Sequence, residues 1–258
     1  MHPIHIESPS GEPPAADARD RAQSHPAGSA ARKALFLHIP KTGGTSLVKA
    51  ARDNLPHAAV MSHADFVAKD KRQIGEIAFV SGHFGYDFAA EFMAGRFSFT
   101  FLRDPVDRVL SFYHFARHAD PATYEIYRLA RTYRLEEFVE RGYRGDPVIR
   151  ENLWNHQARL LSIGWRAISL DAEEILGQAI NNLRGFSYVG LTETMEDDYR
   201  NIASALGWAT NGPAPRELSN PDRPTKRDIS SATLERILQL TALDAQLYAT
   251  ARRTRGDG

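Results

Sequence analysis

Short apolar runs alternate along most of the chain with longer segments in which apolar residues recur every three or four positions. The runs lie at 34–39, 58–61, 77–80, 97–102 and 187–191. Their length, and the glycine and proline residues that flank several of them, are typical of buried strands. Because strands alternate with helical patterns, we expect an α/β fold in which parallel strands are joined by right-handed crossovers and helices cover both faces of the sheet.

Helical periodicity appears between and after these runs. A first helix is expected to begin near Gly44, and the further segments with this period are 86–94, 105–118, 123–132, 135–141, 149–161, 171–183, 193–206 and 231–253. From 105 to 183 the pattern is helical throughout, which predicts a large helical insertion between two strands of the sheet. An insertion at this place is expected to form one wall of a substrate cleft.

The first 31 residues differ from the rest. They contain five Pro, many Ala and Ser, and no hydrophobic periodicity. Such a segment buries too little apolar surface to offset the entropy of ordering it. We therefore expect a disordered leader over 1–31, followed by a single domain over 32–258, a size that one core can support.

Composition and charge exclude several classes of function. The 258 residues contain 32 Lys plus Arg and 32 Asp plus Glu, which argues against a general binder of nucleic acid or anionic membranes. The absence of Cys excludes disulfides, thiolate metal sites and a Cys nucleophile. No apolar run approaches the roughly 18 residues of a membrane span, and the leader lacks the apolar stretch of a secretion signal. A cytoplasmic protein without a transmembrane segment is expected.

The sequence HIPKTGGTSL at 38–47 follows the first apolar run and predicts an anion site. Glycines at 43 and 44 permit positive φ and let main-chain N–H groups approach an anion closely. The helix that begins here directs its unpaired N–H groups and positive dipole end to the same place. The expected ligands are Lys41, Thr42, Gly43, Gly44, Thr45 and Ser46. Lys precedes the glycines, whereas in a Walker A loop it follows them, so a nucleoside triphosphate is less favoured than another phosphorylated ligand.

A second anion site is expected where the 97–102 run ends. Asp104 is a suitable N-cap and Pro105 a suitable first helical residue, so a helix begins here. Arg103 then lies at the carboxyl end of a strand, the edge at which open α/β sheets bind ligands. Ser111 faces the same side of the helix about 10 Å further along, so one phosphate can receive bonds from Arg103 and Ser111. The alternative is that Arg103 pairs with Asp104 or Asp107. Two anion sites on neighbouring strand ends favour a nucleotide with two phosphorylated positions.

The motifs HIPKTGGTSL and FTFLRDPVDRVLSFY, at 38–47 and 99–113, together resemble those of sulfotransferases that use 3'-phosphoadenosine 5'-phosphosulfate (PAPS). Within this superfamily the chain is most similar to the carbohydrate branch typified by heparan sulfate 2-O-sulfotransferases, over about residues 33–250. The resemblance implies a P-loop-like parallel sheet, PAPS as co-substrate and no metal. It also implies that residues 41–46 hold the 5'-phosphosulfate, that Arg103 and Ser111 hold the 3'-phosphate, and that the acceptor is a hydroxyl, in this branch that of a glycan.

A general base is expected at His83, which follows the 77–80 run in the sequence SGHFG. Flanking glycines let the backbone turn and present the imidazole, which at its ordinary pKa of about 6.5 is mostly neutral near pH 7 and able to accept the acceptor's proton. The family resemblance points to the same residue. Lys41 is the second expected catalytic residue, on the leaving-group side. The alternative for His83 is a hydrogen-bonded structural imidazole.

Further candidates lie in the weaker motifs. Asn152, His156 and Gln157 are expected acceptor contacts. Arg223, Lys226 and Arg227, in the loop NPDRPTKRD at 220–228, are expected to close over the 3'-phosphate, with a solvated loop as the alternative. The arginine-rich segment 117–166 suits either an anionic acceptor or an ordinary solvated helical surface.

Two other functions remain open at this point. One is an ATP- and Mg²⁺-dependent phosphotransferase with a P-loop-like fold. The other is a non-catalytic binder of a nucleotide or polysaccharide. The identity of the acceptor, the oligomeric state and the role of the leader are not determined by the sequence.

Overall fold

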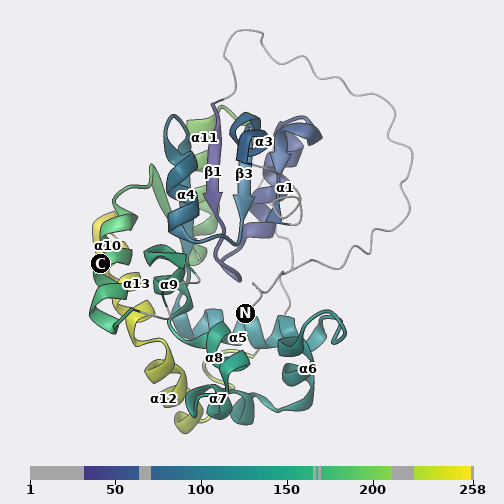
Figure 1. Cartoon of the computed structure of the whole chain (residues 1–258), viewed down its shortest axis with the longest axis vertical. Helices are drawn as coiled ribbons and strands as arrows, with labels where there is room; N and C mark the ends of the chain where they lie inside the picture. The colour runs from purple at the N-terminus through teal and green to yellow at the C-terminus, as the bar shows by residue number, and fades with distance from the viewer. Residues whose placement is uncertain (1–31, 64–70, 165–166, 168–169, 211–223, 257–258) are drawn as a thin grey trace.

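The computed structural model describes residues 32–63, 71–164, 167, 170–210 and 224–256 (Figure 1). The expected leader over 1–31 and the candidate Arg223 lie outside these residues. Within the described part, five strands form one parallel sheet in the order β2-β3-β1-β4-β5. The strands are β1 (Ala34–Leu37), β2 (Val60–Met61), β3 (Phe79–Gly82), β4 (Phe97–Leu102) and β5 (Tyr188–Leu191). The α/β class and the parallel sheet are therefore confirmed.

Alternating residues of the strands face two different layers of helices. Phe36 and its neighbours on one face pack against α1 (Gly44–Asn54) and α11 (Met195–Leu206). Leu35 and Leu37 on the other face belong to a cluster that includes α4 (Tyr86–Met93), α10 (Ala172–Leu183) and α13 (Ala242–Arg255). Because both faces are covered, the strands read as continuous apolar runs in the sequence.

The register brings three loops to one edge of the sheet. Leu37 pairs with Gly82 of β3 and with Thr100 of β4. The loop after β1, His83 after β3 and Arg103 after β4 therefore leave the sheet at its carboxyl edge. Figure 1 shows the arrowheads of β1 and β3 pointing toward the helical half of the molecule, where α5, α8 and α9 lie.

The helical insertion forms its own apolar cluster. Its helices are α5 (Pro105–His118), α6 (Glu125–Thr132), α7 (Leu135–Tyr143), α8 (Pro147–Leu153) and α9 (His156–Ser162). Buried residues of α5 to α8 form this cluster together with α12 (Ser231–Leu240). The expected insertion between 105 and 183 is thus present. Two short elements were not expected: α3 (Lys71–Glu76) and the 3₁₀ turn His57–Ala59, which leaves β2 shorter than the apolar run.

Two helices that the periodicity predicts as continuous are each broken. The 149–161 pattern divides into α8 and α9 at Asn155, whose φ is 42°, and the 231–253 pattern divides into α12 and α13 at Thr241. Asn155 binds across to the second break: its N–H donates to Leu240 O at 3.0 Å and its Oδ1 accepts from Leu243 N–H at 2.9 Å. The two helix breaks are thus hydrogen-bonded to each other. The hydrophobic periodicity reflects local sequence only, so it does not predict this long-range contact.

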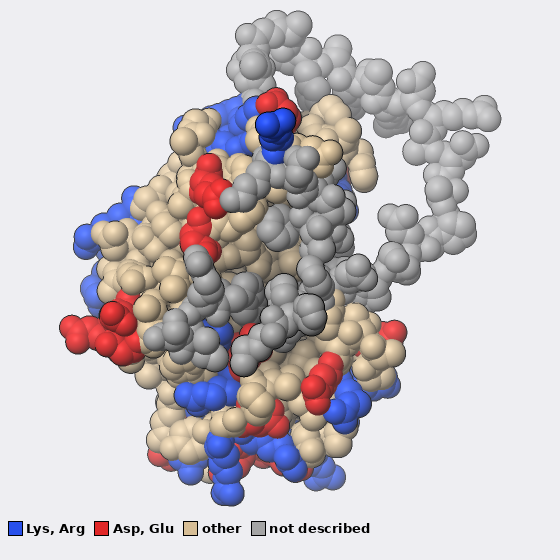
Figure 2. Space-filling model, viewed as in Figure 1, with Lys and Arg blue, Asp and Glu red and all other residues tan. Residues whose placement is uncertain are grey.

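Three of the nine arginines in the segment 117–166 form ion pairs with nearby glutamates. Arginines bind glutamates one turn away, at 3.0, 3.1 and 2.6 Å, in the pairs Arg128–Glu125, Arg141–Glu137 and Arg144–Glu140. Figure 2 shows basic and acidic side chains interspersed over the lower part of the face, where α6 to α8 lie in Figure 1. The pairing favours a solvated helical surface over an acceptor site for this segment.

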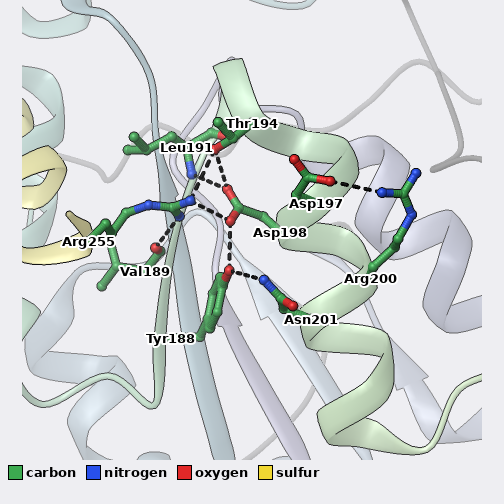
Figure 3. Close-up of polar contacts among 9 residues, drawn as sticks. All are labelled: Tyr188, Val189, Leu191, Thr194, Asp197, Asp198, Arg200, Asn201 and Arg255. Carbon is green, nitrogen blue, oxygen red and sulfur yellow. Dashed lines mark hydrogen bonds and ion pairs between the residues drawn. The ribbon is translucent and has the colours of Figure 1, made fainter. Parts of the chain in front are cut away.

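A buried carboxylate joins β5, α11 and α13 beside the sheet (Figure 3). Asp198 is fully buried, and its Oδ1 accepts from the Tyr188 hydroxyl at 2.6 Å and lies 2.7 Å from Arg255 Nη2. Its Oδ2 accepts from Leu191 N–H and from the Thr194 hydroxyl, each at 2.8 Å. These partners compensate the desolvated charge and connect the C-terminal helix to the strand that follows the insertion.

Candidate active site

The loop from β1 to α1 is folded back on itself by Thr42. Its hydroxyl and its N–H both donate to Ile39 O, at 2.8 and 3.3 Å, and its side chain is fully buried. Lys41 and Gly43 have φ values of 72° and 85°. The left-handed conformation at Gly43 uses the freedom that the sequence predicted there, whereas at Lys41 it is strained. The Thr42 hydroxyl therefore shapes the loop that is expected to hold the anion.

The N-terminus of α1 has no side-chain cap, and the Met195 side chain packs over Gly43. Gly43 occupies the N-cap position and has no side chain to bind the first N–H groups, and no acidic residue lies in the first turn. The macrodipole and these N–H groups therefore retain their positive potential. Thr45 is exposed and Ser46 is buried in this turn. Gly44 is needed for a reason the sequence did not indicate: a Cβ there would lie 2.0 Å from Nε2 of His38, so the His38 ring occupies that space.

Arg103 contacts the loop after β1 directly. Its Nη1 donates to Lys41 O at 3.0 Å, and the residue is only 9% exposed. Asp104 caps α5 as predicted, because its Oδ1 accepts from the N–H groups of Val106 and Asp107 at 3.0 and 3.1 Å. The two motifs that predict anion sites are thus neighbours at the carboxyl edge of the sheet, and no Arg103 pairing with Asp104 or Asp107 is found among the described residues.

Gln157 fixes the main chain of Arg103. Its Oε1 accepts from Arg103 N–H at 3.0 Å and its Nε2 donates to Arg103 O at 2.9 Å. The N–H groups of Gln157 and Ala158 donate in turn to the Asp244 carboxylate at 3.3 and 2.8 Å. Gln157 was expected to contact an acceptor, but it is fully buried and both ends of its amide are engaged. The placement corrects that expectation: Gln157 positions Arg103.

The other two expected acceptor contacts are also buried. Asn152 is 9% exposed, and its Nδ2 donates to Val148 O at 2.9 Å. His156 is 3% exposed, and its Nδ1 lies 3.4 Å from Glu151 O. Burial, assisted by Arg108, lowers the pKa of His156 well below its ordinary value. In this arrangement both side chains contact main-chain carbonyl groups of the insertion, and their contact with an acceptor stays a prediction.

Three imidazoles form a cluster at the edge of the sheet. The His38 and His83 rings lie 4.6 Å apart between centroids in an edge-to-face arrangement, and the His63 and His83 rings are stacked at 4.3 Å. His63 was not identified from the sequence. It follows the edge strand β2, whose Met61 pairs with Val80 of β3, so the register brings it beside His83. The sequence signal for His63 is its position two residues after the apolar run at 58–61.

The surroundings of His38 and His83 favour the neutral forms of these two rings. Burial, followed by unfavourable electrostatic interaction with His38, His63, His156 and Lys41, lowers the pKa of His83 well below its ordinary value of 6.5. Burial, followed by His63 and Lys41, lowers the pKa of His38 to about 3. Both rings therefore carry a lone pair at neutral pH. His83, which is partly exposed, is the one at the position expected for a base.

A model of the sulfotransferase family matches residues 29–249. The chain belongs to the sulfotransferase family. No curated protein sequence matches it significantly. In the described part of this sulfotransferase, no helix is long and apolar enough to cross a bilayer. No group of three or more His, Asp or Glu side chains among the described residues is arranged to hold a metal ion.

The side chain of Lys41 in this sulfotransferase extends to α5. Its Nζ lies 4.0 Å from the centroid of the Phe115 ring, a cation–π contact. Ser111 lies one helical turn before Phe115, on the same face of α5, and is 8% exposed. The loop cation and the predicted hydroxyl ligand therefore meet at one face of the helix.

The 224–228 loop of the sulfotransferase reaches the start of α5. Lys226 Nζ lies 2.7 Å from Asp104 Oδ2 and 4.0 Å from Asp107 Oδ2. Asp228 accepts from the N–H and hydroxyl of Thr225 at 2.8 and 2.7 Å, which closes a turn in the loop. Arg227 is exposed. Lys226 thus contacts Asp104, the residue next to Arg103 in the chain.

Proposed function

We propose that the chain transfers the sulfuryl group of PAPS to an acceptor hydroxyl, that of a carbohydrate. The observation that carries the proposal is the 3.0 Å bond from Arg103 Nη1 to Lys41 O. This bond makes the two candidate anion sites adjacent, as a single nucleotide with phosphates at both ends requires. The resemblance of both motifs to the carbohydrate branch supports the choice of acceptor.

The donor's charged groups match the available positive groups. The 5'-phosphosulfate is held by Lys41, by the uncapped N-terminus of α1 and by the hydroxyls of Thr45 and Ser46. The 3'-phosphate is held by Arg103 and Ser111, with Arg223, Lys226 and Arg227 closing over it. Lys226 now binds Asp104, so its approach to the phosphate exchanges one anionic partner for another.

In the proposed reaction the acceptor oxygen attacks sulfur in line, and the bond from sulfur to the 5'-phosphate oxygen breaks. His83 takes the proton of the attacking hydroxyl on its imidazole. Lys41 and the N-terminus of α1 neutralise the charge that develops on the leaving phosphate. General base catalysis of this type contributes about 10² to 10⁴ in rate, and positioning contributes much of the remainder.

The test is transfer of labelled sulfate from PAPS to a panel of glycans, lipids and small alcohols, read by mass spectrometry. Label is expected on glycan hydroxyls. His83→Ala is expected to abolish transfer while adenosine 3',5'-bisphosphate still binds. Phosphate transfer from ATP with Mg²⁺ would instead support a phosphotransferase, and nucleotide binding without any transfer across the panel would support a non-catalytic binder.

A further inference from the structure

His63 makes two separate contacts with His83. Its Nδ1 accepts a hydrogen bond from the main-chain N–H of His83 at 3.1 Å. Its ring stacks on the His83 ring, with centroids 4.3 Å apart and an interplanar angle of 23°. One side chain therefore contacts both the backbone and the imidazole of the proposed base.

The main-chain bond fixes the tautomer of His63. A backbone N–H can only donate, so Nδ1 must carry a lone pair, and the neutral ring must hold its proton on Nε2. Protonation of Nδ1 would place two N–H groups against each other. The bond and the stack together determine the position, rotation and protonation pattern of the His63 ring.

The loop that carries His83 depends on such contacts for its position. Gly82 and Gly85 flank the His83-Phe84 pair, and glycines leave a backbone with more conformational freedom than other residues. On one side, Gly82 O accepts from His38 N–H at 3.1 Å. On the other, the backbone of Gly85 packs closely on Gly164, because a Cβ on Gly85 would lie 2.2 Å from Gly164 Cα. Between these two anchors, the bond from His83 N–H to His63 fixes the residue that presents the imidazole.

We propose that His63 is a positioning residue for catalysis, which holds the main chain and the ring of His83 in place for proton transfer. The proposal rests on the proposed function, in which His83 is the base. His63 follows β2 at the edge of the sheet, whereas the donor site lies at the ends of β1 and β4. Loss of His63 should therefore slow the chemical step and leave donor affinity unchanged. Misplacement of a reacting group by about 1 Å can cost about 10²-fold in rate.

The experiment separates the two contacts with two variants. His63→Asn retains a short hydrogen-bond acceptor and removes the stacked ring, whereas His63→Phe retains a ring and removes the acceptor. His57→Asn is the control, because His57 is exposed and lies before β2, whereas His63 follows this strand. The measurements are kcat and KM for sulfuryl transfer and the affinity for adenosine 3',5'-bisphosphate. His63→Phe is expected to lower kcat about 100-fold, with nucleotide affinity within twofold of wild type. His63→Asn should lower kcat less than His63→Phe, and the His57→Asn control should leave kcat unchanged.

A spectroscopic measurement makes the test independent of activity. In ¹⁵N-histidine NMR spectra of the full chain, His63 should show an unprotonated Nδ1 and a proton on Nε2. The main-chain amide proton of His83 should shift strongly upfield in His63→Phe and less in His63→Asn. The proposal would be overturned by a protonated Nδ1 of His63 in wild type or by an unshifted His83 amide proton in His63→Phe. It would also be overturned if folded His63→Phe kept a kcat within twofold of wild type, or if this variant lost as much nucleotide affinity as kcat. If wild type transfers no sulfate, the proposed function fails, while the NMR result still decides whether His63 holds His83.

Discussion

Replacing Gln157 by Glu tests whether its amide holds Arg103. The Oε1 that accepts from Arg103 N–H is retained, but the Nε2 donor 2.9 Å from Arg103 O becomes an oxygen. Above the pKa of the new carboxyl, a buried carboxylate oxygen then faces a carbonyl oxygen. Losing one buried hydrogen bond costs about 1 kcal/mol, and the unsatisfied acceptors cost about 1–3 kcal/mol more, so we expect a destabilisation of about 2–4 kcal/mol at pH 8.

The loss should depend on pH with a defined sign. When protonated, the new carboxyl supplies an O–H donor to Arg103 O and restores the bond. Burial raises the folded-state pKa of the new carboxyl above its ordinary value of about 4.3, which it keeps in the unfolded state. Below about pH 4.3 the variant should therefore be as stable as wild type, and it should lose stability as the pH rises from there to the folded-state pKa. Urea unfolding at pH 4, 6 and 8 measures the difference. Gln239→Glu, on the exposed face of α12, is the control. Its new carboxylate would lie near Glu235 and Arg236, so we expect a change of at most about 0.5 kcal/mol at any pH.

Nucleotide affinity gives the functional half of this test. A displaced Arg103 main chain moves the guanidinium that is proposed to hold the 3'-phosphate. Calorimetric titration at pH 8 should show that adenosine 3',5'-bisphosphate loses about tenfold more affinity than adenosine 5'-phosphate, a difference of about 1.4 kcal/mol. Equal losses for the two nucleotides, or a variant as stable as wild type at pH 8, would refute the positioning role of Gln157.

Arg103, Gly44 and the buried histidines each give one further prediction. Arg103→Ala should weaken adenosine 3',5'-bisphosphate binding by about 10- to 100-fold and adenosine 5'-phosphate much less, since a charge-assisted bond contributes about 1.5–3 kcal/mol; equal weakening in titration would place the 3'-phosphate elsewhere. Gly44→Ala should destabilise by about 1–3 kcal/mol because its Cβ would meet the His38 ring, whereas Gly177→Ala, with open space around it in α10, should be neutral or stabilising; thermal unfolding compares them. Acid should destabilise the protein. His38, His83 and His156 have lowered pKa values in the folded state, so on unfolding below about pH 6.5 these three side chains take up protons. Asp244, whose pKa is raised by burial to about 6, releases one proton on unfolding between about pH 4 and 6. The net uptake of at most two protons (three minus one) gives a slope of up to about 2.7 kcal/mol per pH unit in urea titrations, and stability that is flat between pH 4 and 6 would contradict these assignments.

Much of the fold could be predicted because its signals are local. The strands are buried on both faces and appear as short apolar runs, and the cap at Asp104 is formed by the residues that predict it. The broken helices could not be predicted in the same way. Asn155 leaves the helical conformation because it binds residues of the α12–α13 junction more than 80 positions away, and this tertiary contact overrides the periodicity.

The candidate site shows the same division. Lys41 and Arg103 were expected near each other because both follow strands of one parallel sheet, and they are in contact. The roles of Gln157 and His63 were not anticipated. Each acts through a bond from its side chain to the main chain of a residue 54 or 20 positions away, which no local pattern contains.

The charge distribution of the site gives the low pKa of His83 a role in the proposed reaction. In the free protein, burial and then the neighbouring His38, His63, His156 and Lys41 lower the pKa of His83, so the imidazolium form is disfavoured and the lone pair is available. A bound phosphosulfate brings negative charge beside Lys41 and opposes the contribution of that cation to the pKa of His83. The imidazolium that forms on proton transfer then lies near an anion and is better tolerated than in the free protein. In the proposed reaction, His83 is thus unprotonated before the donor binds, and its basicity rises when the donor is in place.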